Sequence, residues 1–334
     1  MEKIFPHRHA ELKAEIMLKY IHDENAVGSI QKSSPFGGRM KHIFIINPAA
    51  GKGRSSQLIP FIEECFKDKE DECSIYITKY PGQGAEIARE HAGREKCRIY
   101  AVGGDGTVNE AVNGIAGTAS SLGVIPTGSG NDFIRSYQET FDIKRMIAET
   151  VGGREKTIDL ARVNDKYFIN ISSIGFDANV VFNANKFKKV PGITGSMAYL
   201  FSVIYTVFKK KISAIKVDMD GEKMELRALL VAIANGRYYG GGIMPAPGAE
   251  LDDGLLDVCL VREVTRFQIL NLFPKYMKGL HGQIKEASFH KCRKISIEST
   301  EKLCVNIDGE IIEEKTVDFE IIEGGINIIL PDRG

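Results

Sequence analysis

The chain has 334 residues, a length that favours two domains. Its apolar fraction of 43% and charged fraction of 26% are ordinary for a folded globular protein, and 44 basic side chains balance 44 acidic ones, so no overall charge points to nucleic acid as a partner. The six cysteines show neither a C-x-x-C pair nor zinc-binding spacing, and several lie in apolar strand patterns, which indicates buried thiols in a reducing cytoplasm.

The first 39 residues differ in character from the rest of the chain. They are polar, hold three of the seven histidines and contain no apolar signal-peptide core. We expect residues 1–39 to be a tag-like leader or an upstream start, weakly ordered in either case, with a genuine regulatory arm as the alternative. Met40 then begins an apolar strand.

Strands and helices alternate over the next hundred residues. Strands are predicted at 41–46, 74–78, 98–102 and 122–125, and helices at about 55–68, 83–94, from 105 onward and 142–151. This alternation predicts a parallel sheet with helices on both faces.

The third of these strands runs into a loop in which Gly103, Gly104 and Gly106 surround Asp105. Glycines let a ligand approach the backbone closely, and a helix start offers N–H groups and a partial positive charge, so the pattern predicts a phosphate site. A carboxylate among phosphates requires a metal or a ribose hydroxyl in between. Thr107 could cap the helix or bond a phosphate oxygen. The alternative is a plain tight turn.

Two further glycine loops follow strands of the same sheet. Residues 47–53 (Asn-Pro-Ala-Ala-Gly-Lys-Gly) lack the spacing of a Walker A loop, and residues 126–133 hold Thr, Ser and two glycines. Ligands of parallel sheets bind beyond the carboxyl ends of the strands. Three such loops at one edge predict a single nucleotide held by all of them.

The pattern changes after residue 155, where strands dominate. They are predicted at 157–163, 167–171, 212–219, 226–234, 255–261, 292–298, 303–307, 317–322 and 326–330, with one helix at about 266–279. The turn signals 220–221 and 308–309, both Asp-Gly, indicate hairpins. We expect an antiparallel sandwich or barrel-like domain over 156–319, after an α/β domain over 40–155 to which 320–334 could return.

One uncharged stretch, 190–208, has nearly the length of a membrane span. Its helix should begin near Thr194, which leaves about 15 residues or roughly 22 Å, too short to cross a bilayer. Lysines flank it at 186–189 and 209–211. Either it is a packed helix with solvated ends, or it is an interfacial segment whose lysines meet anionic lipid.

Taken together, five motifs (47–53, 103–107, 126–133, 251–257 and 306–310) resemble the diacylglycerol kinase catalytic-domain family, most closely its bacterial lipid kinases. The glycine–aspartate loop alone is also found in NAD kinases and phosphofructokinases. The resemblance implies a Rossmann-like α/β domain of that kind, followed by an antiparallel β-sandwich domain, with ATP in the cleft between them.

The same resemblance implies which residues act. Nucleotide contacts would fall on Asn47, Gly51, Lys52, Gly53, Thr78, Gly103, Gly104, Asp105, Gly106, Thr107, Val108, Asn109 and Ser129. Asp105 would hold nucleotide-bound or catalytic Mg²⁺, directly or through water. Ser129 stands where the family often has Thr, and it retains the hydroxyl.

A second metal site is implied by the stretch 250–255. Asp253 would give a carboxylate and Glu250 and Leu255 backbone carbonyls to Mg²⁺, which prefers oxygen ligands, and Asp159 would link this ion to the nucleotide loop through water. Glu310 resembles the general base of the family. Glu222 lies in nearly the same sequence (Asp-Met-Asp-Gly-Glu), and only its position before the metal stretch speaks against it.

These motifs lead us to expect an ATP- and Mg²⁺-dependent lipid kinase that phosphorylates the hydroxyl of diacylglycerol to give phosphatidic acid for phospholipid biosynthesis. We expect a cytoplasmic protein that contacts the inner face of the membrane peripherally and transiently, with a homodimer possible. The alternatives are a kinase of a sphingoid base, phosphatidylglycerol or NAD, and a non-catalytic regulator that binds nucleotide or lipid.

Overall fold

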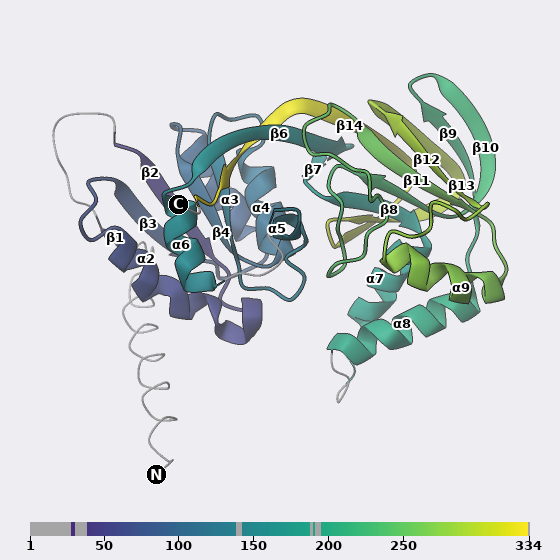
Figure 1. Ribbon diagram of the computed structural model, residues 1–334, viewed down its shortest axis with the longest axis horizontal. Coiled ribbons are helices and arrows are strands. Elements are labelled where there is room, and N and C mark those ends of the chain that lie inside the picture. Colours follow the sequence, from purple (N-terminus) through teal and green to yellow (C-terminus); the bar gives the residue numbers. More distant parts are fainter. Residues whose placement is uncertain (1–27, 31–38, 138–141, 188–189, 191–194, 333–334) are drawn as a thin grey trace, which may run out of the picture. The chain divides into compact units, whose positions relative to one another are not determined.

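The structure is a computed structural model that describes residues 28–30, 39–137, 142–187, 190 and 195–332 (Figure 1). The chain forms two compact units. The first takes Met1–Gly128, Phe141–Lys156 and Asn327–Gly334, and the second takes Ser129–Thr140 and Thr157–Ile326. Two strands, β6 (Arg154–Val163) and β14 (Glu310–Leu330), pass from one unit into the other.

The first unit is built on a mainly parallel sheet with the strand order β1-β3-β2-β4-β5-β14. Its strands are β1 (Gly28–Ile30), β2 (Lys41–Ile46), β3 (Glu72–Ile77), β4 (Arg98–Gly103), β5 (Ser121–Pro126) and the end of β14. Strands β2 to β5 pair in parallel, and so do β5 and β14 at Asn327 and Ile328, whereas β1 runs antiparallel to β3. The long apolar runs of β2, β4 and β5 are typical of strands that are buried on both faces.

Helices cover both faces of this sheet, as predicted. The helices α2 (Ile59–Cys65) and α6 (Ile143–Val151) pack on the face to which Phe44, Ile46 and Tyr100 point. The helices α3 (Gln83–Ala92) and α4 (Asp105–Ile115) pack together on the other face, where Ile45 lies beneath α3. Because successive side chains of a strand alternate between faces, β2 contributes to both cores.

The second unit contains an antiparallel β-sandwich. Its strand order is β14-β13-β8-β10-β11-β12, with β9 paired to β10 and β13, and with β7 paired to β6. The strands not yet given are β7 (Lys166–Phe168), β8 (Ile171–Gly175), β9 (Ser213–Met219), β10 (Glu222–Ala234), β11 (Leu256–Arg262), β12 (Ala287–Cys292) and β13 (Lys294–Ile307).

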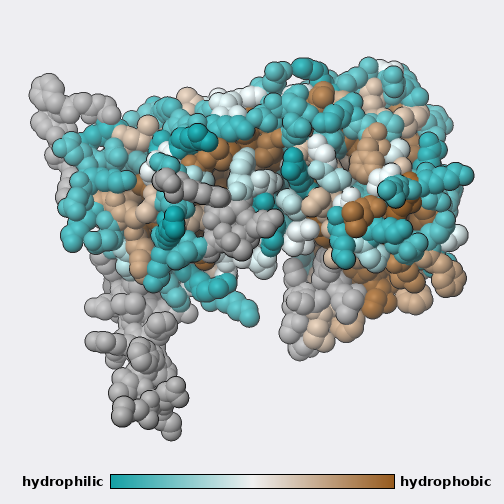
Figure 2. Space-filling view, viewed as in Figure 1, coloured by the Kyte–Doolittle hydropathy of each residue, from teal (hydrophilic) through white to brown (hydrophobic). Residues whose placement is uncertain are grey.

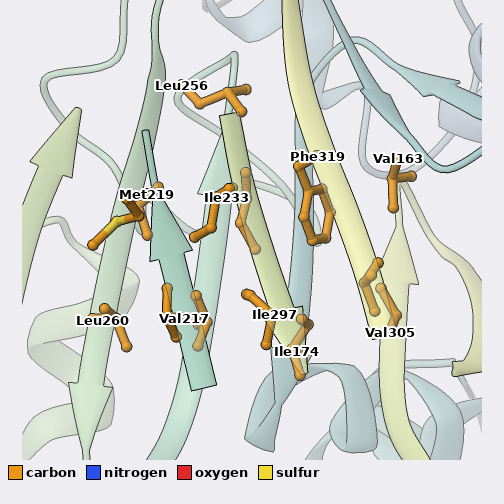
Figure 3. Packing of buried hydrophobic residues seen from close by; sticks show 14 of the residues in the cluster. Val163, Ile174, Val217, Met219, Ile233, Leu256, Leu260, Ile297, Val305 and Phe319 are labelled. Carbon is orange, nitrogen blue, oxygen red and sulfur yellow. The ribbon is translucent and has the colours of Figure 1, made fainter. Parts of the chain in front are cut away.

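Strand β10 shows how this unit forms two cores. Its residues Val231 and Ile233 point into the sandwich, where they meet Val217, Ile297 and Phe319 (Figure 3). The alternate residues of β10 lie in a second core, beneath α7 (Phe176–Phe187), α8 (Gly195–Lys209) and α9 (Arg266–Met277). The seven residues at the end of β10 are therefore buried on both faces.

Most predicted elements are present, with corrections where long-range contacts act. The predicted strand 167–171 is divided into β7 and β8, because the backbone N–H groups of Ile169, Asn170 and Ile171 bond the carboxylate of Asp308 instead of a neighbouring strand. The strands predicted as 292–298 and 303–307 form the single strand β13, and those at 317–322 and 326–330 belong to β14.

Three further differences concern segment boundaries. The helix predicted at 55–68 begins with a 3₁₀ turn at Ser55–Leu58 and ends at Cys65. Ser129–Thr140, expected in the α/β domain, belongs to the second unit, where Asp132 accepts two 3.0 Å contacts from the backbone N–H of Gly241. The leader predicted over 1–39 lies outside the described residues except for β1 and Arg39.

In the described part of the chain, no helix is both long and apolar enough to span a bilayer. Helix α8, which contains most of the uncharged stretch, has 15 residues.

Candidate functional site

The central glycine loop joins β4 to α4 with one residue between them, because β4 ends at Gly103 and α4 begins at Asp105. A Cβ atom on Gly103 would lie 2.1 Å from Oγ1 of Thr107, a separation that real atoms do not tolerate. Packing within the loop therefore dictates glycine at position 103. The carboxylate of Asp105 lies in the first turn of α4 and is half-buried.

Gly106 has no comparable packing reason. It is the second residue of α4 and its φ is not left-handed. No heavy atom of the described chain lies within 4 Å of a Cβ built on it, its two chain neighbours and the helix's own backbone apart. A glycine within a helix costs about 1 kcal/mol relative to alanine. The missing side chain at Gly106 leaves the backbone open to a ligand, as the phosphate-site prediction requires.

Thr107 bonds a neighbouring loop and does not cap the helix. Nδ2 of Asn47 donates to its Oγ1 at 3.2 Å, while Oδ1 of Asn47 accepts from the N–H of Ala49 at 3.0 Å. The N-cap residue of α4 is Gly104, which has no side chain to make a cap bond, so the capping role considered for Thr107 is wrong.

The loop after β2 is bent sharply by three successive left-handed residues, Gly51, Lys52 and Gly53, with φ of 59°, 58° and 85°. A Cβ on Gly51 would lie 2.3 Å from the carbonyl oxygen of Thr127, and the N–H of Thr127 donates to the carbonyl of Gly103 at 2.8 Å. The structure thus brings the starts of all three glycine loops together within the first unit. The side chain of Lys52 is exposed.

The other predicted nucleotide contacts differ in what they can offer. The N–H of Thr78 donates to the carbonyl of Ile46 at 2.9 Å, directly before the Asn47 loop. The side chains of Val108 and Asn109 are buried, and the N–H of Val108 is bonded to the carbonyl of Gly104 at 3.1 Å. Ser129 is exposed and belongs to the second unit.

Glu310 is the first residue of β14, directly after the Asp308-Gly309 turn in the second unit. Its side chain is 52% exposed, and Oε2 lies 3.0 Å from Nζ of Lys166 at the start of β7. The carboxylate of Glu310 is thus accessible from solvent and held in place by an ion pair.

The Asp308 turn that precedes Glu310 is anchored by its aspartate. The carboxylate of Asp308 accepts the N–H groups of Ile169, Asn170 and Ile171 at 2.9, 3.3 and 3.0 Å. The turn before Glu222, which has the same Asp-Gly-Glu sequence, is anchored in the same way: Asp220 accepts the N–H groups of Arg293 and Lys294 at 2.8 Å each. Both aspartates have a left-handed backbone conformation, with φ of 45° at Asp308 and 49° at Asp220.

In the predicted metal-binding stretch 250–255, the carboxylate of Asp253 already contacts the ammonium group of Lys291. Nζ of Lys291 lies 2.6 Å from Oδ2 of Asp253 and 3.2 Å from Oδ2 of Asp257. Although burial favours a neutral amine, the hydrogen bonds to these two carboxylates raise the pKa of Lys291. The other oxygen of Asp253 accepts the N–H of Leu255 at 3.1 Å.

These residues fit a divalent ion at Asp253 only if Lys291 withdraws, so we derive no chemical step through a metal there. Within the described ranges, no three His, Cys, Asp or Glu side chains are grouped to hold a metal ion. Asp159 is buried and accepts the N–H groups of Gly254 and Gly324 at 2.7 and 2.8 Å. Its position ties the metal stretch to β14.

Sequence reasoning missed the partners of its predicted site residues. Lys166 and Lys291 carried no signal because each lies far along the chain from the carboxylate that it contacts. The three consecutive glycines Gly240–Gly242, which all have a left-handed φ, could have been noticed in the sequence. The N–H of Gly241 donates to Asp132, within the third glycine loop.

Comparisons with known proteins identify both halves of the chain. Residues 41–163 match the model of the diacylglycerol kinase catalytic domain, and residues 170–330 match that of the YegS C-terminal NAD kinase beta sandwich-like domain. A diacylglycerol kinase of Mycobacterium tuberculosis is 30% identical over 71% of this chain and 77% of its own. One from Bacillus subtilis is 27% identical over 86% of this chain and 95% of its own.

Solved structures agree with these matches. The crystal structure of a candidate diacylglycerol kinase from Bacillus anthracis superposes with a TM-score of 0.70 at 27% identity, covering 88% of this chain and 98% of that one. The chain thus shares with these proteins a mixed α/β region followed by a C-terminal β-sandwich.

Proposed function

Because the chain belongs to the diacylglycerol kinase catalytic-domain family, we propose that it transfers the γ-phosphoryl group of ATP to the hydroxyl of a diacylglycerol-type lipid. The product would be a phosphatidic acid, and the reaction would supply phospholipid biosynthesis. The first unit would act as a Rossmann-like nucleotide domain that binds ATP.

The observation that carries this proposal is Gly106. Three glycines surround Asp105, and the packing of Thr107 explains only Gly103. Gly106 is retained within α4 where alanine would stabilise the helix and meet no other part of the described chain. A phosphate that approaches the first turn of α4 accounts for it, because backbone N–H groups at a helix start bind phosphate oxygens.

The reaction follows from these parts in one step. The lipid hydroxyl oxygen forms a bond to the γ-phosphorus as the bond to the β,γ-bridging oxygen breaks, and ADP leaves. Glu310 accepts the proton of the hydroxyl. If that proton stayed on the attacking oxygen, the energy of the transition state would be higher. Lys166 holds the Glu310 carboxylate in place. The glycine loop of the first unit holds the phosphates by backbone N–H groups.

Mg²⁺ enters this proposal as a companion of ATP. A divalent ion bound with ATP would neutralise the charge that develops on the phosphates. The half-buried carboxylate of Asp105, in the first turn of α4, is the group of this chain that would hold that ion or a water bound to it.

The test is a substrate panel with Mg²⁺ and ATP. Mixed micelles would carry diacylglycerol, ceramide, sphingosine or phosphatidylglycerol, with NAD as the soluble acceptor, and product would be followed with γ-labelled ATP. We expect phosphorylated diacylglycerol that disappears in Asp105→Ala. Phosphorylation of NAD alone would contradict the proposal, and product from another lipid would correct the acceptor.

A further inference from the structure

Helix α8 of the second unit buries small and hydroxyl residues together with Val203 and Val207, while several of its larger apolar residues are exposed. The side that faces α7 presents small and hydroxyl residues: Ala198, Ser202 and Thr206 are buried there. Ser202 donates to the carbonyl of Val180, and Nδ2 of Asn183 donates to Oγ1 of Thr206 at 3.1 Å. A helix of a globular protein normally turns its large apolar residues inward.

Four large apolar residues of α8 lie on its exposed side. Phe201, Ile204, Tyr205 and Phe208 recur at intervals of three, one and three residues, so they share one face, and each is exposed. Phe208 is 72% exposed. Scattered exposed apolar residues need no explanation, whereas a contiguous apolar face of this kind marks an interaction surface.

Helix α9 extends this face. Its Phe267 and Leu270 are 86% and 60% exposed, while Ile269, Leu272 and Tyr276 of the same helix are buried in the core. Nε of Arg266 donates to the carbonyl of Phe208 at 3.3 Å, so the end of α8 meets the start of α9. Figure 2 shows apolar side chains gathered over these two helices. We call Phe201, Ile204, Tyr205, Phe208, Phe267 and Leu270 the α8–α9 face.

The chain segments that contain α8 and α9 are rich in basic residues. The 40 residues 178–217 contain seven lysines and no acid, and the 22 residues 264–285 contain four basic residues and no acid. The acids beside these helices already have partners: Glu263 pairs with Lys210 and Arg227, Glu301 pairs with Lys211, and Glu286 accepts from Nε2 of Gln268. Lys209, at the end of α8, is exposed.

We propose that the α8–α9 face is the surface by which the protein docks on an anionic phospholipid bilayer. The apolar side chains would enter the boundary between head groups and acyl chains, and the surrounding lysines and Arg266 would meet lipid phosphates. The inference rests on the proposed function in one respect, since a lipid substrate supplies the reason to dock.

Charge favours a bilayer over a second copy of this chain as the occupant. Two copies that met through this face would bring their basic residues together, with no acidic residue in 178–217 or 264–285 to compensate. Like charges brought together across an interface oppose association. An anionic bilayer complements both the apolar face and the positive charge.

The test compares Phe208→Glu/Phe267→Glu with the control Phe61→Glu. Phe61 lies on α2 of the first unit and is also exposed, so the control makes one substitution of the same kind away from the face. The full-length proteins would be sedimented, without ATP, with vesicles of phosphatidylcholine alone or with 30% phosphatidylglycerol added. Phosphorylation of a water-soluble short-chain diacylglycerol would be measured in parallel.

We expect wild type and Phe61→Glu to bind the anionic vesicles, more weakly as salt is added, and the double variant to bind at least about tenfold less, because burial of each phenylalanine accounts for such a factor. The double variant should retain wild-type activity on the short-chain substrate, which shows that it is folded.

Three outcomes would overturn the docking proposal: equal vesicle binding by the double variant, binding that ignores the lipid charge and the salt, or a wild-type dimer that the double variant abolishes while vesicle binding persists. Charge-dependent docking without phosphorylation of either diacylglycerol would support the docking surface and refute the proposed function. The two proposals can therefore fail separately.

Discussion

Nζ of Lys166 lies 3.0 Å from Oε2 of Glu310, which joins the start of β7 to the first residue of β14. Both side chains are substantially exposed, so the pair contributes at most about 1 kcal/mol to stability. Its effect is on position: it holds a carboxylate at the end of a hairpin that Asp308 has already anchored to three backbone N–H groups.

Glu310→Gln should lower kcat by roughly 10²- to 10⁴-fold, the usual share of a general base, because the amide cannot accept the proton of the lipid hydroxyl. The melting temperature should hardly change, because the side chain is exposed. Steady-state kinetics in mixed micelles measure the effect.

Glu222→Gln is the matched control, since it changes the same residue type after an Asp-Gly turn with the same anchoring. If Glu222→Gln loses the activity and Glu310→Gln keeps it, the general base has been assigned to the wrong hairpin.

Alanine at Gly106 and at Gly103 should have opposite consequences. Gly106→Ala should leave stability unchanged or raise it by up to about 1 kcal/mol, while kcat/KM for ATP falls roughly 10- to 200-fold, because a methyl group enters the space of the phosphate. Gly103→Ala should lower the free energy of unfolding by about 1–3 kcal/mol, because its Cβ collides with Thr107.

Denaturant titration and ATP kinetics measure both glycine variants. Gly152→Ala serves as the control, because a Cβ there would be 3.4 Å from the carbonyl of Ala148, an ordinary contact. Normal ATP kinetics in Gly106→Ala would remove the observation on which the proposed function rests.

Lys291→Met should destabilise the protein in the presence of EDTA by about 1 kcal/mol, a modest amount because the lysine is partly exposed. The variant leaves Asp253 and Asp257 without their ammonium partner, so millimolar Mg²⁺ should raise its melting temperature more than that of the wild type. Differential scanning calorimetry with EDTA or Mg²⁺ makes the comparison. An equal response of the two proteins would show that Mg²⁺ does not bind at Asp253.

Asp177 should give the stability of the protein a distinct pH dependence. Its carboxylate is buried and accepts from the hydroxyl of Tyr239 at 2.5 Å, and burial raises its pKa to about 6 from an ordinary 3.8. Because the folded-state pKa lies above that of the unfolded chain, the carboxyl group stabilises the fold most below pH 4, and this contribution is lost as the pH rises to about 6.

The measurement is the difference in unfolding free energy between wild type and Asp177→Asn. It should change between pH 4 and 6, the interval set by the two pKa values, and be constant above pH 7. A difference that is flat across this range would mean that Asp177 titrates normally. Asparagine can still accept the N–H of Ala178, now 2.9 Å from Oδ1, so the variant should fold.

Much of the fold could be predicted because its signals are local. The apolar runs of β2, β4 and β5 are read from consecutive residues, and the two Asp-Gly hairpins from pairs of residues. Helix α7 was not predicted, because its residues have weak helical periodicity. The division at Asn170 was also missed, because the carboxylate that causes it lies 138 residues further along the chain.

The sequence by itself determined the strand–loop–helix order, the three glycine loops and the resemblance to a kinase family, because each depends on residue types at short spacing. Only the tertiary structure decided that Thr107 bonds Asn47, that Lys291 contacts Asp253, and that Phe201, Ile204, Tyr205 and Phe208 of α8 are exposed. The physical reason is the same in all three cases. A partner or a solvent-facing side is set by residues brought together from distant parts of the chain, and composition and periodicity do not record which residues those are.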